Sequence, residues 1–341
     1  MTRIHLTTAA NENYAPGLLV MVASALTSLD PSAAITIHVF NGGLSSNSLK
    51  TLERICKTVH PHGSLVNIPF DESFFKGVTV GPGNSFMCYT RLLLGTMIDC
   101  EKAIYLDSDI LVLRDLKEVW EMDMQGKTSL VCKDDRIPTI SFDCPWPLDE
   151  KSRNIPYFNS GLMVIDLNQW RRKSIESESL KLARSSECKF YDQTILNYIL
   201  RDDVAFINNH WNWQAVSEPE KEPKNYHFVE RQKPWSSYRG ELRCQLWRLY
   251  YSTFVGAPEL YLLSRKQYRL ALTWAKDYLT YQWKAAAFVY RIYLTLVYGK
   301  AAAKASCPPA TFSRDQEWRQ TRLAEKNILG QYARKIRLKA S

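Results

Sequence analysis

The chain has 341 residues, of which 45% are hydrophobic and 23% are charged. This composition excludes a disordered or collagen-like protein, and about 150 residues per domain allows one large domain or two smaller ones. The net charge of +9 is unevenly distributed, because residues 240–341 carry 18 Lys or Arg against 6 Asp or Glu. Such an asymmetry predicts a polyanionic surface as the partner of the C-terminal part.

The eight cysteines are scattered and form no CxxC pair. In a chain of this length, the pattern favours reduced thiols in a cytosolic compartment over disulfides or a zinc site. The apolar run at residues 15–26 contains Ala23-Ser24-Ala25, which imitates a signal-peptide cleavage site. We interpret this run as a helix, since a strand pattern already precedes it. No stretch of 18 uncharged apolar residues occurs, so no membrane-spanning helix is expected.

Short apolar runs alternate with helical patterns through the first 240 residues. In chain order, the expected strands are Ile4–Thr8, Ile35–Phe40, Leu65–Ile68, Ala103–Leu106, Ser129–Val131, Leu162–Asp166 and Val204–Phe206. The expected helices are Gly17–Leu29, Asn47–Thr58, Tyr89–Met97, Glu178–Ser185 and Asp192–Leu200. This alternation predicts an α/β fold with a mostly parallel central sheet between helices. Two longer connections, residues 71–85 and 134–157, are candidate active-site loops.

The amino-acid composition changes near Gly240, after which Trp and Tyr are interleaved with Arg and Lys. The last segment, Arg314–Lys339, is strongly basic and helical in propensity. We therefore divide the chain into residues 1–239 and a basic, aromatic, helical appendage at 240–341. Trp and Tyr rings can lie at the level of the lipid headgroups, and Lys and Arg can bind anionic lipid. This composition therefore favours attachment to a membrane surface. The alternatives are a helical core packed on the first domain, and nucleic-acid binding, for which no module is recognisable.

The segment Tyr105-Leu106-Asp107-Ser108-Asp109 places two carboxylates one residue apart after an expected strand. Ligands of α/β sheets bind outside the carboxyl ends of the strands, and two alternating carboxylates there can hold a divalent cation. Alone, this D-x-D pattern is a weak signal, because solvated loop carboxylates would look the same.

Two segments upstream supply polar groups that fit around this pair. The turn at residues 9–14 lies where a nucleotide base and ribose would bind, although Asn11 or Asn13 could instead cap a helix. Arg91 stands in an apolar helix, so it needs a phosphate, a carboxylate or a sugar hydroxyl as its partner. A structural salt bridge would satisfy the same requirement.

Two segments downstream complete the set. Asn159, in Tyr157–Gly161 before a strand, and Asp192 with Gln193, at a helix start, suit sugar hydroxyls. A turn and a helix-terminal carboxylate would account for the same residues. His227 could bind a transition metal and Lys233 a diphosphate, although a lone histidine is more often a satisfied side chain.

In this order and spacing, the motifs resemble glycosyltransferase family 8, whose members are retaining enzymes with nucleotide-sugar donors. The chain is most similar to the bacterial lipooligosaccharide and lipopolysaccharide galactosyl- and glucosyltransferases, and the resemblance covers about residues 3–240. The motifs that carry it are A-A-x-x-N-Y, Y-x-R-L, Y-L-D-x-D, F-N-x-G, D-Q and H-x5-K-P-W.

The resemblance implies a single Rossmann-like glycosyltransferase-A fold. It also implies metal-dependent transfer of galactose or glucose from a UDP-sugar to a hydroxyl of a cell-surface glycan, forming an α linkage. Asp107, Asp109 and His227 would bind the metal, with Mn²⁺ favoured over Mg²⁺ by ligand type. The residues implied for the donor are Ala9, Asn11, Asn13, Tyr14, Arg91, Asp107, Ser108, Asp109, Asn159, Asp192, Gln193, His227 and Lys233.

One departure concerns Asn11, because the bacterial relatives often have Asp there. Asn can still pair with uracil through its carbonyl. The catalytic candidates are Gln193 and Asp192. Gln193 is a poor nucleophile and Asp192 is better suited to hold a sugar hydroxyl, so we favour attack from the leaving-group face over a covalent intermediate.

A lipid-linked glycan acceptor would place the enzyme in the cytoplasm, on the inner face of the membrane. Two other functions remain open. One is a catalytically silent nucleotide-sugar-binding subunit, against which the complete set of metal ligands argues. The other is a haloacid-dehalogenase-type phosphatase, whose D-x-D lies on the first strand with Thr or Val at the place of Leu111.

Overall fold

The computed structural model describes residues 1–82, 85–214, 224–229, 231, 233–236, 242–256, 328–336 and 338–339. They belong to two compact units, Met1–Glu230 and Arg231–Ser341. Within the second unit, the described residues form helix α9 (Leu242–Tyr250), a π-helical turn (Tyr251–Val255) and a helix at 328–336. Most of the expected appendage, residues 257–327, lies outside the described residues. No helix in the described ranges is long and apolar enough to cross a bilayer.

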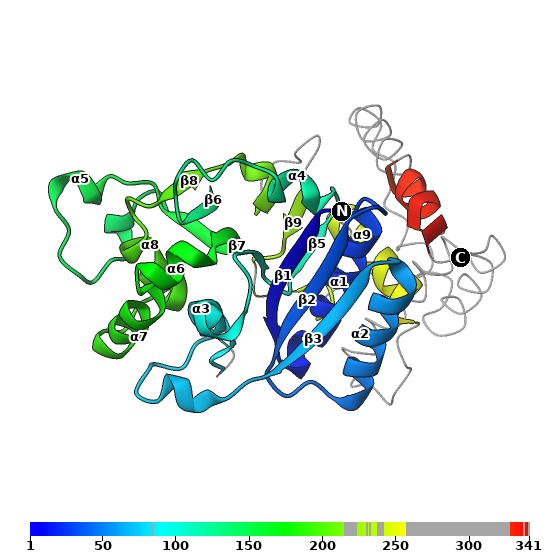
Figure 1. Ribbon diagram of the computed structural model, residues 1–341, viewed down its shortest axis with the longest axis horizontal. Helices are drawn as coiled ribbons and strands as arrows, with labels where there is room; N and C mark the ends of the chain where they lie inside the picture. Colours follow the sequence, from blue (N-terminus) through cyan, green and yellow to red (C-terminus); the bar gives the residue numbers. More distant parts are fainter. Residues whose placement is uncertain are drawn as a thin grey trace, which may run out of the picture. The chain divides into compact units, whose positions relative to one another are not determined.

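A seven-stranded sheet organises the described part of the first unit (Figure 1). Its strand order is β3-β2-β1-β4-β7-β6-β8, and every neighbouring pair is parallel except those that involve β7. The expected mostly parallel sheet is therefore confirmed. The strands are β1 (Arg3–Ala10), β2 (Ala34–Asn41), β3 (Gly63–Pro69), β4 (Lys102–Leu106), β6 (Ser129–Lys133), β7 (Phe158–Asp166) and β8 (Val204–Phe206).

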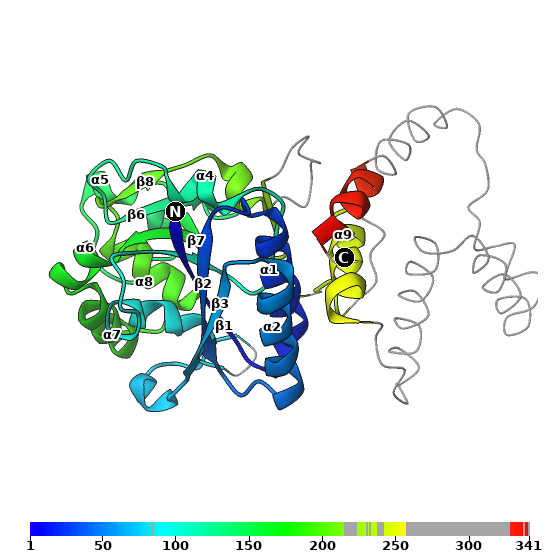
Figure 2. The same cartoon turned by 45° about the vertical axis from the view of Figure 1, so that its right-hand side comes forward.

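Helices cover both faces of this sheet, as α/β architecture requires (Figures 1 and 2). Helices α1 and α2 lie on one face, and α3, α6, α7 and α8 lie on the other. Strand residues such as Leu6, Ile37 and Ile104 are consequently fully buried. The helix bounds are α1 (Ala15–Ser28), α2 (Ser46–Val59), α3 (Leu94–Met97), α4 (Leu116–Trp120), α5 (Glu150–Arg153), α6 (Leu167–Arg172), α7 (Ile175–Ser185) and α8 (Tyr191–Ile199).

Two elements differ from the prediction. The helix expected at 89–97 is a 3₁₀ helix (Met87–Leu93) followed by one α turn, and the Thr90 hydroxyl and the Arg91 Nε bond carbonyl oxygens three residues back. Strand β7 begins four residues before its expected start, because Phe158 and the next residue continue the ladder with β6 across a bulge. The F-N-S-G motif therefore lies inside a strand.

A two-stranded ribbon was not expected from the sequence. Strand β5 (Ile110–Val112) pairs antiparallel with β9 (Asn225–His227), which comes more than 100 residues later in the chain. Three residues are too short a run to show a strand period. The ribbon brings the end of the D-x-D segment beside His227.

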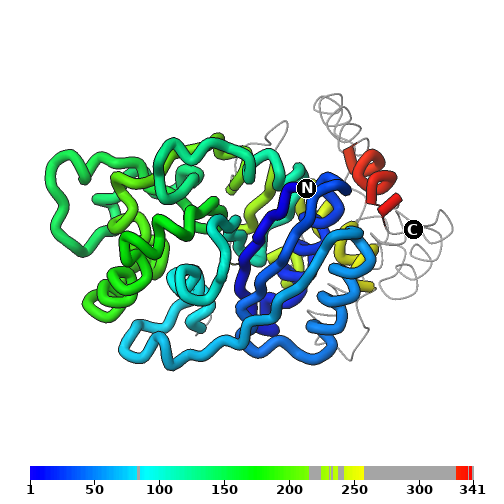
Figure 3. Tube along the Cα trace, viewed as in Figure 1, coloured from blue at the N-terminus to red at the C-terminus, as the bar shows by residue number. Residues whose placement is uncertain are grey.

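The parallel strands end at one edge of the sheet, which we call the functional edge. Figure 3 shows the path of the chain along these strands. Strands β1, β4 and β6 deliver their carboxyl ends there. Because β7 runs antiparallel to β4 and β6, its N-terminal residues lie at the same edge. Short 3₁₀ turns complete the connections, at Glu12–Tyr14, Glu72–Phe75, Ile140–Phe142 and Asn209–Asn212.

A histidine pair between β1 and β2 makes the fold sensitive to acid. His5 Nδ1 lies 3.1 Å from His38 Nε2, and burial lowers the pKa of His38 from 6.5 to about 4. The unfolded chain therefore binds more protons than the folded one between pH 6.5 and 4, so stability falls as pH falls through that window. We expect His38→Leu to lose less melting temperature than the parent between pH 7 and pH 4.5. Equal losses would contradict this assignment.

Candidate functional site

A cavity of about 180 Å³ opens at the functional edge of the sheet. Its walls come from the ends of β1 and β4, from the turn after β1 and from the 3₁₀ helix at 87–93. Seven of the predicted site residues line it: Ala9, Asn11, Tyr14, Arg91, Asp107, Ser108 and Asp109.

The D-x-D segment is held by main-chain hydrogen bonds on both sides. The amide of Asp107 donates to the carbonyl of Gly161 on β7 (2.8 Å), and the amide of Phe228 donates to the carbonyl of Asp109 (3.1 Å). Ile110 pairs directly with His227 in the β5–β9 ribbon. The register of that ribbon therefore places the imidazole next to the second carboxylate.

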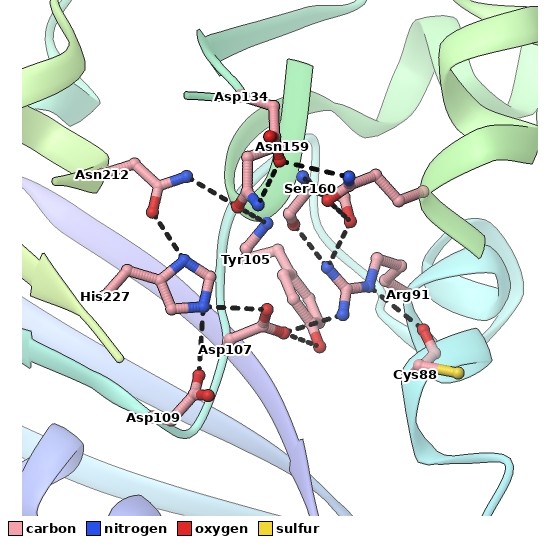
Figure 4. Close-up of polar contacts among 12 residues, drawn as sticks. Cys88, Arg91, Tyr105, Asp107, Asp109, Asp134, Asn159, Ser160, Asn212 and His227 are labelled. Carbon is pink, nitrogen blue, oxygen red and sulfur yellow. Dashed lines mark hydrogen bonds and ion pairs between the residues drawn. The ribbon is translucent and has the colours of Figure 1, made fainter. Parts of the chain in front are cut away.

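Asp107, Asp109 and His227 form a cluster whose ligand atoms all lie within 4.8 Å of one another. His227 Nε2 is 3.6 Å from Asp107 Oδ2 and 3.2 Å from Asp109 Oδ1 (Figure 4). His227 Nδ1 lies 2.8 Å from the side-chain oxygen of Asn212. Two carboxylates and an imidazole whose other nitrogen is engaged suit Mn²⁺ or another divalent ion.

His227 is a satisfied side chain, because Asn212 and the two carboxylates engage both ring nitrogens, and the same arrangement offers a ligand set for a metal ion. His227 is 4% exposed, and its Nε2 faces the carboxylate groups of two residues that are separated by Ser108 in the chain. Close packing brings these groups together, because a Cβ on Gly161 would lie 2.2 Å from His227 Cε1 and 2.8 Å from Asp107 Oδ2. Only glycine leaves room for the cluster at this point of β7.

Arg91 is buried and bridges two carboxylates. Its Nη2 lies 2.7 Å from Asp107 Oδ1, and its Nε lies 2.9 Å from Asp192 Oδ2. Its Nη1 donates to the carbonyl and hydroxyl oxygens of Ser160, and the guanidinium lies over the Tyr105 ring. The alternative of a structural salt bridge is therefore realised for this arginine. Its position also places a fixed positive charge at the cavity wall.

The charges around Arg91 influence each other. Burial raises the pKa of Asp192 to about 6, against the attraction of the Arg91 guanidinium. Although burial disfavours its charge, Arg91 has its pKa raised above the ordinary value by Asp107 and Asp192. The Arg91 guanidinium thus favours the ionised form of the buried Asp192 carboxyl.

Other predicted residues lie beside the cavity or apart from it. Asn159, Asp192 and Gln193 adjoin Ser160, which contacts Arg91. Asn13 is exposed and does not line the cavity. Lys233 belongs to the second unit, so it is not placed relative to these groups.

The helix-cap alternative for Asn11 is wrong. Asn11 occupies the N-cap position of the first 3₁₀ turn, but its side chain makes no capping hydrogen bond. Its Oδ1 atom is buried without a hydrogen-bond partner. A carbonyl oxygen in this state at a cavity wall is available to a ligand donor.

Three residues of the site were missed or only partly recognised from the sequence. Asn212 sits in a His-Trp-Asn-Trp run that carries no signal for a site. Asp134 marked the start of a candidate loop, and its place directly after β6 could have identified it. Ser160 lies inside the F-N-x-G motif, but its contacts depend on the path of β7.

Sequence similarity connects this chain with a known protein family and with several bacterial proteins. The model of "Glycosyl transferase family 8" matches residues 5–239. General stress protein A of Bacillus subtilis is 26% identical over 263 residues, which cover 69% of this chain and 88% of that protein. A putative glycosyltransferase of Haemophilus influenzae is 29% identical over 178 residues, covering 48% and 53%. Lipopolysaccharide 1,2-glucosyltransferase of Escherichia coli is 24% identical over 169 residues, covering 45% and 49%. The chain thus spans about half the length of these last two relatives.

Solved structures show the same fold. The galactosyltransferase LgtC in complex with donor and acceptor sugar analogues superposes with a TM-score of 0.61 at 22% identity, covering 79% of this chain and all of that one. An active-site mutant of LgtC gives the same TM-score and identity, covering 75% and 98%. The glycosyltransferase-A fold is therefore confirmed. Since the family model also matches well over half of the sequence, this chain belongs to glycosyltransferase family 8 and is a glycosyltransferase.

Proposed function

We propose that this glycosyltransferase transfers galactose or glucose from a UDP-sugar to a hydroxyl of a cell-surface glycan, with retention of configuration. The observation that carries the proposal is the Asp107–Asp109–His227 cluster at the wall of a cavity that reaches the turn after β1. Asp107, Asp109 and His227 would hold a divalent ion that neutralises the diphosphate, and the cavity would receive the nucleoside.

The nucleoside part of the donor is assigned to the cavity lined by Ala9, Asn11 and Tyr14. The unpartnered Oδ1 of Asn11 can accept a hydrogen bond from the uracil imide. Adenine and cytosine have no imide N–H at the corresponding ring position. This acceptor therefore favours uracil over adenine and cytosine, while guanine, which also has a ring N–H beside a carbonyl, is not distinguished by it.

A divalent ion held by Asp107, Asp109 and His227 would supply Lewis-acid stabilisation of the diphosphate leaving group. Mn²⁺ is favoured over Mg²⁺, because an imidazole completes the ligand set. Asp107 also accepts from Arg91 and from the Tyr105 hydroxyl, which restrict the orientation of its carboxylate. Lys233 is proposed to add positive charge near the diphosphate.

Gln193 is assigned to orient the donor sugar. Its Oε1 accepts from the amide of Ser160 (3.0 Å), and its Nε2 is 3.4 Å from Asp134 Oδ2. An amide held at both ends is poorly suited to form a covalent intermediate. We therefore propose same-face attack, in which a departing phosphate oxygen takes the proton of the acceptor hydroxyl. Asp192 would hold a hydroxyl of the donor sugar, and Asn159 would line the same subsite.

The acceptor is proposed to be a lipopolysaccharide-like glycan, with the protein bound peripherally at the inner face of the cell membrane. The support is the basic, aromatic composition of residues 240–341. Co-sedimentation of the full chain with anionic and with neutral vesicles tests this attachment. Binding only to anionic vesicles, reduced by salt, is the expected result, and equal binding to both would exclude it.

UDP release by the purified protein is the test of the proposed reaction. With Mn²⁺ present, UDP-galactose, UDP-glucose and UDP-N-acetylglucosamine are compared, and EDTA serves as the control. We expect slow, EDTA-sensitive hydrolysis of a galactose or glucose donor. Mn²⁺-dependent binding of UDP without release, even with glycan acceptors, would support the silent subunit. The absence of both binding and release would overturn the proposal.

Asp109→Asn is expected to weaken Mn²⁺ binding by about tenfold and to slow donor hydrolysis in parallel. The substitution keeps the shape of the side chain but removes the charge that faces His227 Nε2. Electron paramagnetic resonance of free Mn²⁺ measures the affinity. Asp123→Asn is a matched control, because Asp123 is exposed on a turn after α4. Unchanged Mn²⁺ affinity in Asp109→Asn would remove Asp109 from the metal site.

A further inference from the structure

A chain of buried side chains leads away from the back of the metal cluster. His227 Nδ1 contacts Asn212 Oδ1 (2.8 Å), Asn212 Nδ2 donates to Asn159 Oδ1 (2.9 Å), and Asn159 Nδ2 donates to Asp134 Oδ2 (3.0 Å) (Figure 4). The exposed fractions of these four residues lie between 0% and 7%. These side chains are largely shielded from bulk water, so their polar atoms need partners within the protein.

The direction of each hydrogen bond in this chain is set from the Asp134 end. Asp134 accepts on both of its oxygens, from main-chain amides on Oδ1 and from Asn159 on Oδ2, so Asn159 points its NH₂ group toward it. The carbonyl end of Asn159 then faces the opposite way, where it accepts from the Gly161 amide (3.0 Å) as well as from Asn212. Asn212 must in turn direct its own carbonyl toward His227.

This order leaves one arrangement for the imidazole. Facing a carbonyl oxygen, His227 Nδ1 must carry a proton and donate it. Nε2, the atom directed at Asp107 and Asp109, is then the ring nitrogen that a metal ion would use. We infer that Asp134, Asn159 and Asn212 form a polar relay that fixes the metal-binding tautomer of His227, with Asn212 as its positioning residue. The inference rests on the proposed metal site but concerns residues outside the ligand set.

The relay also connects the metal cluster with the proposed sugar subsite. Asp134 Oδ2 lies 3.4 Å from Gln193 Nε2. Its other oxygen accepts from the main-chain amides of Arg136 (2.9 Å) and Ile137 (3.0 Å). Asp134 is thus anchored by its own turn, so the direction that it imposes on Asn159 cannot relax by rotation of the carboxylate.

Because Asp134 is anchored in this way, the variant Asp134→Asn tests the direction of the hydrogen bonds in the relay. The main-chain amides retain the carbonyl oxygen of the new side chain, so its NH₂ group must face the NH₂ group of Asn159. Two donors then oppose each other in a buried position, and either Asn159 turns over or the contact opens. Asn212→Leu breaks the relay at the other end, because it removes the acceptor of His227 with little change in volume.

The relay is tested by two measurements on the full chain. The first is the affinity for Mn²⁺ alone, for which we expect a loss of about 10- to 100-fold in Asn212→Leu and a smaller loss in Asp134→Asn. Asn209→Leu, on the same 3₁₀ turn but outside the relay, is the matched control and should bind Mn²⁺ as the parent does. Melting temperatures show that each variant is folded.

The second measurement is long-range ¹H–¹⁵N correlation of ¹⁵N-histidine-labelled, metal-free protein, with His227→Gln used to assign the signal. We expect a protonated Nδ1 in the parent and partial loss of the Nδ1 proton in Asn212→Leu, where its acceptor is missing. An unprotonated Nδ1 in the parent would overturn the relay, as would unchanged Mn²⁺ affinity in a folded Asn212→Leu variant. If the parent does not bind Mn²⁺, the proposed metal site is wrong. The relay is still tested in that case, because the spectrum of the metal-free protein reports the position of the His227 proton.

Discussion

Gly161→Ala is expected to abolish tight Mn²⁺ binding and to lower donor hydrolysis by on the order of 100-fold, because the cluster would be displaced by about 1 Å. The added Cβ would lie 2.2 Å from His227 Cε1 and 2.8 Å from Asp107 Oδ2. The strand cannot move away, since the Gly161 carbonyl accepts from the Asp107 amide and its amide donates to Asn159. The imidazole and the carboxylate must therefore separate. Mn²⁺ titration and UDP release measure the two effects.

Gly95→Ala is the matched control for Gly161→Ala. Its Cβ would lie 2.9 Å from Trp170 Cδ1, so it also crowds a buried side chain, but the crowding occurs in α3 and α6. Both variants are expected to lose about 1–3 kcal/mol of unfolding free energy through overpacking. Only Gly161→Ala should lose Mn²⁺ affinity. Retention of parental affinity in Gly161→Ala would show that the cluster does not depend on close approach to β7.

The alternation of apolar runs and helical patterns predicted the sheet well, because the central strands β1, β4 and β7 are buried on both faces, whereas the edge strand β3 is only partly buried. The β5–β9 ribbon could not be predicted in this way. Its strands have three residues each and come from distant parts of the chain, so their pairing depends on the finished fold. The early start of β7 also depends on a tertiary contact, because the side chain of Asn197 on α8 accepts a hydrogen bond from the Phe158 amide.

In the candidate site too, residues marked by a local sequence pattern could be predicted, whereas residues that depend on tertiary contacts could not. Asp107 and Asp109 were identifiable because a buried strand of this fold class delivers the residues that follow it to the ligand-binding edge of the sheet. Asn212 was not identifiable, because the role of a buried amide depends on the hydrogen-bond partners that the fold places beside it. Arg91 was recognised as needing a partner, but the sequence could not show that two carboxylates and Ser160 already occupy its donors.

Replacing Arg91 by Met is expected to destabilise the protein by about 3–5 kcal/mol, the usual cost of breaking a buried ion pair at one partner. Asp107 and Asp192 would lose their shared cation, and Asp192 would remain buried. Because Arg91 opposes the effect of burial on Asp192, its removal should raise the pKa of that carboxyl further above 6. Denaturant unfolding at pH 7.5 and at pH 5.5 measures the loss, which should be smaller at the lower pH because Asp192 is then protonated.

Two further variants separate charge from packing at this position. Arg171→Met removes a guanidinium that donates to carbonyl oxygens of Gly95, Ile98 and Cys100, so it should cost less stability than Arg91→Met. The double variant Arg91→Met with Asp192→Asn should recover part of the stability, because the enclosed side chain no longer carries a charge. If the double variant is no more stable than Arg91→Met alone, then lost packing over the Tyr105 ring, and not the unpaired carboxylate, is the source of the destabilisation.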